Sequence, residues 1–203
     1  MTAKYDFSDV REHLLHSIDG AYPTKWEAYQ TASVLGEDVF GSPKPHPNAV
    51  FNLFLEQNVK SAIPMAAHRA ALAGFTSLIN DEPGTVLSRL TLASTIYGVE
   101  VMRGGVSKLA YSIVCGTGLR ECGNEGCLMS LDIGTPEQGM EGLNKIYDVI
   151  VKKEGDLFSP LSLGDTFCAS CAKPVEREYN SWCATVWKNL PRIFRVGKGW
   201  DEL

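Results

Sequence analysis

The sequence lacks any excess of positive charge. Its 19 Lys and Arg residues stand against 24 Asp and Glu, which gives a formal net charge of -5 at pH 7. Proteins that bind a phosphate backbone or an anionic membrane gather positive charge, so this balance disfavours nucleic acid and membrane surfaces as partners. Long apolar runs are also absent: the longest stretch without a charged residue is about eleven residues, whereas a membrane-spanning helix needs about twenty. We therefore expect no membrane-spanning helix.

Targeting and catalytic motifs are absent as well. The first twenty residues carry charges throughout and contain no apolar segment before a small-residue cleavage site, so we expect a cytoplasmic or nuclear protein rather than a secreted one. The sequence contains no nucleophile elbow, Walker loop, dinucleotide fingerprint or HExxH helix. We therefore assign no catalytic residue and no organic cofactor.

The composition is that of a folded protein. With 203 residues, 44% of them hydrophobic and 21% charged, the chain can bury one substantial core. We expect a single α-helical domain over residues 1–203. Within it, residues 1–112 are expected to form the main helical core, and residues 113–203 a cysteine-linked segment with the C-terminal helices.

Capping residues and apolar spacing predict most of the helices. Thr24 precedes Glu27 by three positions, and Thr135 precedes Gln138 in the same way, so two capping boxes predict helices over about 24–35 and from 135 to about 151. Further helices are expected after Ser8, Asn48, Ser61 and Ser88, the last of them ending at Gly104 and Gly105, and over about 172–189.

Alternating strand patterns are scarce. The best strand candidate is Leu109 to Cys115, which a helix explains equally well. The predicted fold class is therefore mostly α: an irregular multi-helix bundle with a zinc knot and at most a short β-hairpin.

Two cysteine pairs carry the most informative chemistry. Cys122 and Cys127 enclose four residues that include two glycines, and Cys168 and Cys171 form a CxxC. Two such pairs supply four soft ligands, the number that a tetrahedral structural zinc site requires. We predict one structural Zn²⁺ bound by Cys122, Cys127, Cys168 and Cys171. Such a closed site stabilises a fold and leaves no coordination position for water.

Other interpretations of the cysteines stay open at this stage. All of them can be free thiols, because free cysteine is among the most buried residue types. A redox function for the CxxC fits poorly, since the βαβ setting of thioredoxin-like proteins is missing. Cys115 is a possible substitute ligand, although the apolar stretch before it favours the core, and Cys183 is most simply a core residue.

Two other functional classes compete with a structural zinc module. One is a small enzyme that uses a zinc-bound water, or a reactive Cys115 or Cys183 beside a histidine brought near by folding. His46, held between two prolines, is the first histidine to consider for catalysis. The other class, a zinc-ribbon-like nucleic-acid binder, needs a basic face, which only three residues near the C-terminus offer: Arg192, Arg195 and Lys198.

The sequence also resembles a known family over nearly its whole length. The resemblance rests on Val10–Leu15, on the segment from Asn52 to Gly74, on the two cysteine pairs and on the ending from Trp187 to Phe194. Together these are similar to the region that follows the BTB/POZ domain in proteins expanded in mushroom-forming fungi. Met1 leads almost directly into the helices of this region, so the BTB domain itself is expected to be absent.

The resemblance implies a helical protein-binding module without established catalysis, in which the paired cysteines form the family's metal knot. It names neither the partner nor the oligomeric state. The expected function is therefore an intracellular, zinc-stabilised, non-catalytic protein-interaction module.

Overall fold

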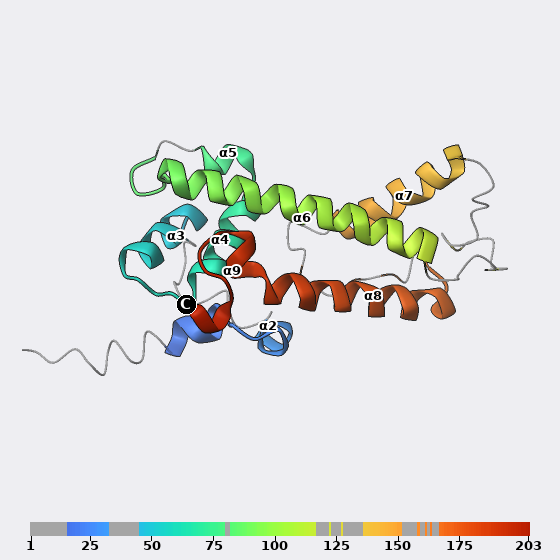
Figure 1. Ribbon diagram of the computed structural model, residues 1–203, viewed down its shortest axis with the longest axis horizontal. Helices are drawn as coiled ribbons and strands as arrows, with labels where there is room; N and C mark the ends of the chain where they lie inside the picture. Colours follow the sequence, from blue (N-terminus) through green and yellow to red (C-terminus); the bar gives the residue numbers. More distant parts are fainter. Residues whose placement is uncertain are drawn as a thin grey trace, which may run out of the picture. The chain divides into compact units, whose positions relative to one another are not determined.

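The computed structural model describes residues 16–32, 45–79, 82–116, 122, 127, 136–151, 158, 161, 163 and 167–203. Every regular element in this part of the chain is a helix, and no strand occurs among these residues (Figure 1). The prediction of a mostly α fold is confirmed. None of the helices described is long and apolar enough to cross a membrane.

The chain groups into two compact units. Unit 1 comprises Met1–Ile96 and Lys188–Leu203, and unit 2 comprises Tyr97–Trp187. Unit 1 holds α2 (Trp26–Ala32), α3 (Pro47–Glu56), α4 (Ile63–Leu72), α5 (Phe75–Leu78), α9 (Leu190–Ile193) and the 3-10 helix η2 (Trp200–Glu202). Unit 2 holds α7 (Pro136–Val151) and most of α6 (Arg89–Gly116) and α8 (Ala169–Lys188). The single domain expected from the sequence stays a prediction.

Helix α3 starts differently from the prediction. Its cap is His46, whose Nδ1 accepts the backbone N–H of Asn48 at 3.2 Å, and Pro47 takes the first helical position. The expectation that Asn48 precedes the helix is wrong, because Asn48 lies in the first turn with its side chain fully buried. There its Nδ2 donates to the carbonyl of Ser77 at 2.8 Å, which ties α3 to α5.

The same histidine contacts Ser77 through its other ring nitrogen, with Nε2 2.8 Å from the serine Oγ. Because Nδ1 accepts a backbone N–H, the neutral ring carries its proton on Nε2, which then donates to Ser77. In this tautomer His46 cannot take a proton from the serine. The pair therefore holds α3 against α5 and is not arranged as a nucleophile and its base.

The connection from α3 to α4 is a Schellman motif. Asn58 adopts the left-handed conformation with φ 53° directly after the helix cap. The N–H of Val59 bonds the carbonyl of Phe54 at 2.9 Å, and the N–H of Asn58 bonds that of Leu55 at 3.2 Å. This pair of bonds satisfies carbonyls that the helix end leaves open, and it turns the chain into α4.

Small side chains on α4 form the centre of the unit 1 core. Ala66, Ala67 and Ala70 are buried, and α4 packs against both α3 and α9. Phe54 of α3 meets the ring of Tyr22 edge-on, with 4.9 Å between ring centroids. The alanines leave room for these larger neighbours, so the backbones approach closely at native packing density.

Helix α6 is longer than the sequence predicted. It starts after Ser88, whose Oγ accepts the N–H of Thr91 as expected, but it continues past Gly104 and Gly105 to Gly116 and includes the strand candidate. The buried positions Met102, Val106, Leu109 and Ile113 recur every three or four residues across the glycines. Burial of that apolar stripe offsets the roughly 1 kcal/mol by which each glycine disfavours a helix.

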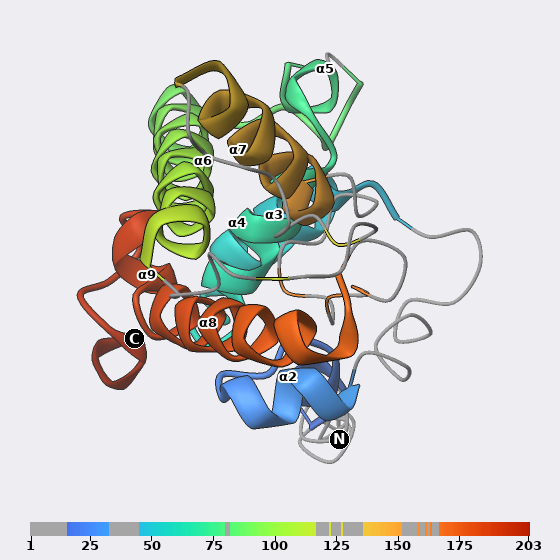
Figure 2. The same ribbon diagram turned by 90° about the vertical axis from the view of Figure 1, so that its right-hand side faces the viewer.

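Helices α6 and α8 cross in antiparallel directions within unit 2, and both α6 and α7 lie above α8 in Figure 2. A Cβ added at Gly105 would lie 3.3 Å from the indole of Trp182, a tighter contact than most side chains make, so the two helices approach closely at this glycine. Further along, Ser112 Oγ donates to Glu178 Oε1 at 3.2 Å. These contacts fix the register of the two helices.

We predict that His46→Ala lowers the free energy of unfolding by about 1 to 2 kcal/mol, because it removes the α3 cap and the bond to Ser77. His46→Asn keeps an acceptor at the cap and is expected to lose less than half as much. Urea unfolding followed by circular dichroism measures both. Equal losses for the two variants would contradict a capping role.

Candidate metal centre

The structure brings the two cysteine pairs together. The sulfur atoms of Cys122, Cys127, Cys168 and Cys171 all lie within 4.8 Å of one another. Cys127 and Cys171 are buried, and Cys122 and Cys168 are half-buried. All four residues belong to unit 2, although 41 residues separate Cys127 from Cys168. The arrangement is compatible with a metal site, as the spacing predicted.

The distances match a coordinated ion better than a disulfide. Four sulfurs at about 2.3 Å from a central zinc lie about 3.8 Å apart, the edge of a regular tetrahedron. The sulfurs of Cys122 and Cys168 are 3.6 Å apart, whereas a disulfide bond is about 2.05 Å long. All four cysteines are free thiols in the structure.

Helix α8 positions the CxxC. It begins at Ala169, so Cys168 is the residue just before the helix and Cys171 lies in its first turn. The carbonyl of Cys168 accepts the N–H of Ala172 at 2.9 Å, the first hydrogen bond of the helix. The N–H of Cys168 donates to the sulfur of Cys127 at 3.4 Å, which links the two pairs directly. Both CxxC cysteines thus lie at the N-terminal end of α8.

Cys168 has an unusually acidic thiol. Its sulfur lies 3.1 Å from the Ser170 hydroxyl, and this hydrogen bond is the main cause that lowers the pKa of Cys168 from 9.0 to about 6. Hydrogen bonds from Cys171 add to the effect. Sequence analysis did not single out Ser170, and its position two residues after Cys168 in the first helical turn is the only signal it offers.

The pKa of the Cys171 thiol shifts in the opposite direction. Burial is the main cause that raises the pKa of its thiol, and the neighbouring sulfurs of Cys168, Cys122 and Cys127 raise it further. Ionising one sulfur therefore makes the next harder to ionise, as like charges in one site require. A divalent cation at the centre would remove this conflict by balancing part of the negative charge.

Apolar side chains from the segment before α8 are buried in the same unit. Phe158 packs edge-on against Trp187, with 5.2 Å between ring centroids, and Leu163 and Phe167 are also buried. The N–H of Phe167 bonds the carbonyl of Leu163 at 2.9 Å, a turn that leads into Cys168. Phe158, Leu163 and Phe167 are thus three buried side chains of unit 2 that precede Cys168 in the sequence.

Of the remaining cysteines and histidines, none whose side chain the structure describes belongs to this cluster. Cys183 is fully buried in the middle of α8, as expected of a core residue. Cys115 belongs to α6, but its side chain lies outside the described residues, as does all of His13. All four histidines of the sequence precede residue 69, so unit 2 contains none. The clustered donor set consists of sulfur alone.

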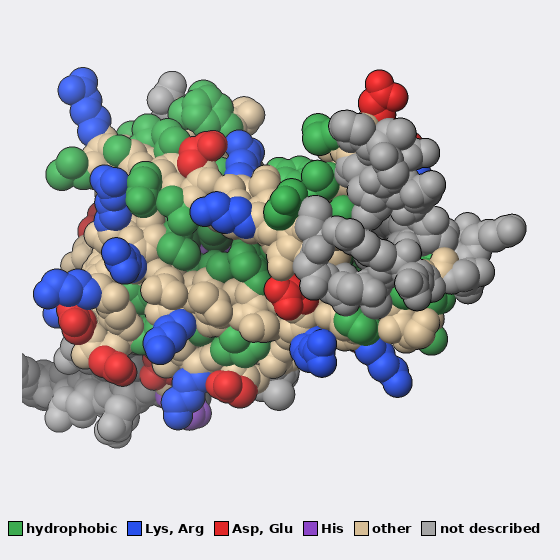
Figure 3. Space-filling model, turned by 45° about the vertical axis from the view of Figure 1, so that its right-hand side comes forward, with side chains coloured by type: hydrophobic (Ala, Val, Ile, Leu, Met, Phe, Trp, Pro, Cys, Tyr) green, Lys and Arg blue, Asp and Glu red, His purple; other side chains and the backbone are tan. Residues whose placement is uncertain are grey.

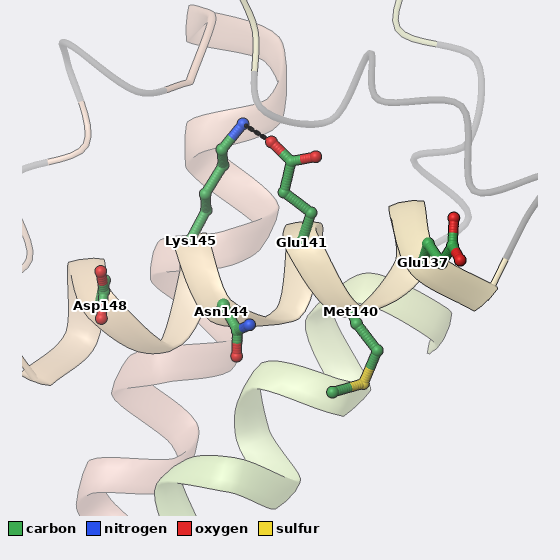
Figure 4. A pocket seen from close by; sticks show the side chains of 6 residues that line it. All are labelled: Glu137, Met140, Glu141, Asn144, Lys145 and Asp148. Carbon is green, nitrogen blue, oxygen red and sulfur yellow. Dashed lines mark ion pairs between the residues drawn. The ribbon is translucent and has the colours of Figure 1, made fainter.

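Two surface hollows offer less chemistry. One, of about 550 Å³, runs along α7 and is lined by Glu137, Met140, Glu141, Asn144, Lys145 and Asp148 (Figure 4). An ion pair of 2.6 Å joins Lys145 to Glu141 there and lowers the pKa of that carboxyl. The other, of about 720 Å³, is lined by the C-terminal basic residues and by Glu202, which pairs with Lys198. Neither hollow combines a nucleophile with a base.

Comparisons with known proteins identify no relative. The sequence matches no protein-family model and no curated protein, and the fold matches no solved structure. The resemblance to the region after a BTB/POZ domain therefore stays a prediction from the sequence.

We predict that, in reduced protein treated with chelator, Cys168 reacts with iodoacetamide at half its maximal rate near pH 6, because the thiolate is the reactive form. Ser170→Ala removes the main cause of the lowered pKa and is expected to move this midpoint towards 9.0. Mass spectrometry of the alkylated peptides at a series of pH values gives the midpoint. With the helical circular dichroism signal intact, an unchanged midpoint in the variant would contradict the assignment.

Proposed function

We propose that this chain is a non-catalytic protein-interaction module whose unit 2 is stabilised by one structural zinc ion. The observation that carries the proposal is the cluster of four cysteine sulfurs within 4.8 Å of one another. A site of this kind contributes folding free energy, because the unfolded chain holds no preformed site.

The donor set favours zinc among the divalent metals. Four thiolates in a tetrahedral arrangement are typical of zinc or iron–sulfur sites, whereas calcium and magnesium prefer oxygen ligands. The 3.6 Å between two of the sulfurs is close to the edge length for a single zinc ion. In this proposal the ion joins the segment of Cys122 and Cys127 to the start of α8.

A full set of four protein ligands supports a structural role over a catalytic one. Catalytic zinc sites keep a position open for water, and four cysteines leave none. For the thiol alternative, the sequence of unit 2 contains no histidine that could activate Cys115 or Cys183 as a nucleophile. These points favour a function exerted through surfaces.

Exposed apolar side chains of unit 1 supply a candidate partner surface. Phe75 and Ile79, at the two ends of α5, are 64% and 51% exposed. Leu53 and Leu55 on α3 are exposed as well, and α3 is tied to α5 through Asn48. Figure 3 shows hydrophobic side chains on the molecular surface between charged ones. Exposed apolar side chains on neighbouring elements are candidates for a protein-binding surface.

A cytoplasmic or nuclear location belongs to the same proposal. Reduced thiols persist in those compartments, whereas secreted proteins oxidise them to disulfides. The similarity to the region after a BTB/POZ domain implies the same kind of interaction module.

We predict about one zinc per chain in protein purified without an affinity tag under reducing conditions, with four thiols protected until a chelator is added. Cys168→Ser or Cys171→Ser is expected to abolish zinc binding and to lower the free energy of unfolding by about 3 kcal/mol or more. Elemental analysis, thiol titration and urea unfolding test this.

Cys183→Ala serves as the matched control, because it removes a buried thiol outside the cluster. It is expected to cost about 1 kcal/mol and to keep the zinc. Six freely reactive thiols and no zinc in the unaltered protein would refute the zinc module.

For the partner surface, we predict that the double variant Phe75→Ser and Ile79→Ser no longer crosslinks to the proteins that the unaltered chain crosslinks to in its host cytosol. The zinc content and the melting temperature of the variant are expected to stay unchanged. Glu56→Gln, which changes an exposed polar side chain of α3, is expected to keep the same crosslinked proteins. Quantitative mass spectrometry compares the variants. If both variants retain the same partners, the interaction does not use this surface.

A further inference from the structure

One side of α6 in unit 2 carries two exposed tyrosines and an exposed valine. Tyr97 and Tyr111 are 43% and 60% exposed, and Val101 between them is exposed too. The tyrosines are fourteen residues apart, four turns of a helix, so they share one face. Gly104 lies midway between them. We call this side the Gly104 face; it also carries Glu100 and Lys108, both exposed.

Nothing in the described part of the chain packs against the position of a side chain at Gly104, the glycine at the centre of this face. At Gly105, its neighbour, a Cβ would lie only 3.3 Å from the indole of Trp182, so a close contact within the chain accompanies that glycine. A Cβ at Gly104 would meet nothing within 4 Å, and φ there is not in the left-handed region. An exposed glycine inside a helix destabilises it by about 1 kcal/mol relative to alanine. Close approach of another backbone is one physical reason that can offset such a cost.

We propose that the Gly104 face binds the same face of a second copy of this chain, with the two α6 helices antiparallel and crossing at Gly104. A two-fold axis through Gly104 places residues equally far before and after it opposite each other. Tyr97 of one copy then meets Tyr111 of the other. Glu100 of one copy meets Lys108 of the other, and this ion pair occurs twice.

The charge pattern selects both the orientation and the occupant. In a parallel pair, Glu100 would face Glu100 and Lys108 would face Lys108, which repels. In the antiparallel pair the opposite charges meet, so the face is complementary to itself. Glu100 already lies 3.3 Å from Arg103 of its own chain, but both side chains are about two-thirds exposed, so this bond contributes little. A self-complementary face fits a second copy better than an unrelated partner.

The contact is small, so the dimer is a weak one. The stretch from Tyr97 to Tyr111 spans about 21 Å of helix axis. Interfaces of this extent fall at the low end of the size range, where association is transient. We therefore expect a dimer that forms reversibly at micromolar concentrations and above.

The test is sedimentation equilibrium of the full chain over a concentration series that reaches several hundred micromolar. The unaltered protein is expected to dimerise, and Glu100→Lys and Lys108→Glu are each expected to weaken the dimer at least tenfold, because each places like charges opposite in both pairs. An equimolar mixture of the two variants restores both opposite-charge pairs in a heterodimer, so association is expected to return to that of the unaltered protein. Native mass spectrometry identifies the heterodimer by its mass.

Matched controls use an exposed ion pair outside the face. Glu141→Lys and Lys145→Glu on α7 make the same charge changes and are expected to leave the dimer unaltered, alone or mixed. Gly104→Gln fills the proposed crossing point with a better helix former, so the dimer is expected to be lost while the melting temperature stays or rises. A monomer at every concentration would overturn the proposal, as would a dimer that survives Gly104→Gln or that the mixture of variants does not restore.

Discussion

Four sulfur atoms confined within 4.8 Å of one another are the constraint on which unit 2 depends. As thiols they are poor hydrogen-bond partners for one another, and as thiolates they repel. The pKa values of Cys168 and Cys171 shift in opposite directions for this reason: the Cys168 thiol ionises readily, and the Cys171 thiol beside it is then harder to ionise. A cation between the four sulfurs makes all of them ionise together, and the sequence segments that carry them then hold one another in place.

The helix that carries two of these sulfurs also connects the cluster to the core. Cys168 and Cys171 fix the first turn of α8, and the same helix contacts α6 at Glu178 and Trp182. Whatever holds the cysteines therefore also fixes where α8 begins, and hence which of its side chains meet α6. Loss of the proposed ion would therefore also shift α8 at its contact with Gly105, further along the helix, because a helix is rigid over such distances.

The cysteine cluster could be predicted from the spacing of the cysteines in the sequence, whereas the packing between distant segments could not. A pair of cysteines close in sequence has few ways to point both sulfurs at one centre, so the clustering of the four cysteines could be predicted from the sequence alone. The end of α6 was placed wrongly at Gly104 and Gly105, because the apolar stripe on its buried face runs through both glycines. The cap of α3 was missed for a similar reason: Asn48 is the better capping residue by type, but the contact with Ser77 draws its side chain inward.

A metal site closed by four protein ligands, as proposed here, leaves no coordination position for a substrate, so the proposed function lies on the surface of the chain. The apolar side chains of α5 are few, and a surface of that size binds weakly when it is presented once. Association of two chains through α6 would present the same surface twice. A partner that itself carries repeated sites then binds with an effective concentration set by the linkage, and its affinity rises without any new contact. On this view the zinc cluster gives unit 2 the stability to form α6, and α6 in turn supplies the valency that a weak binding surface requires.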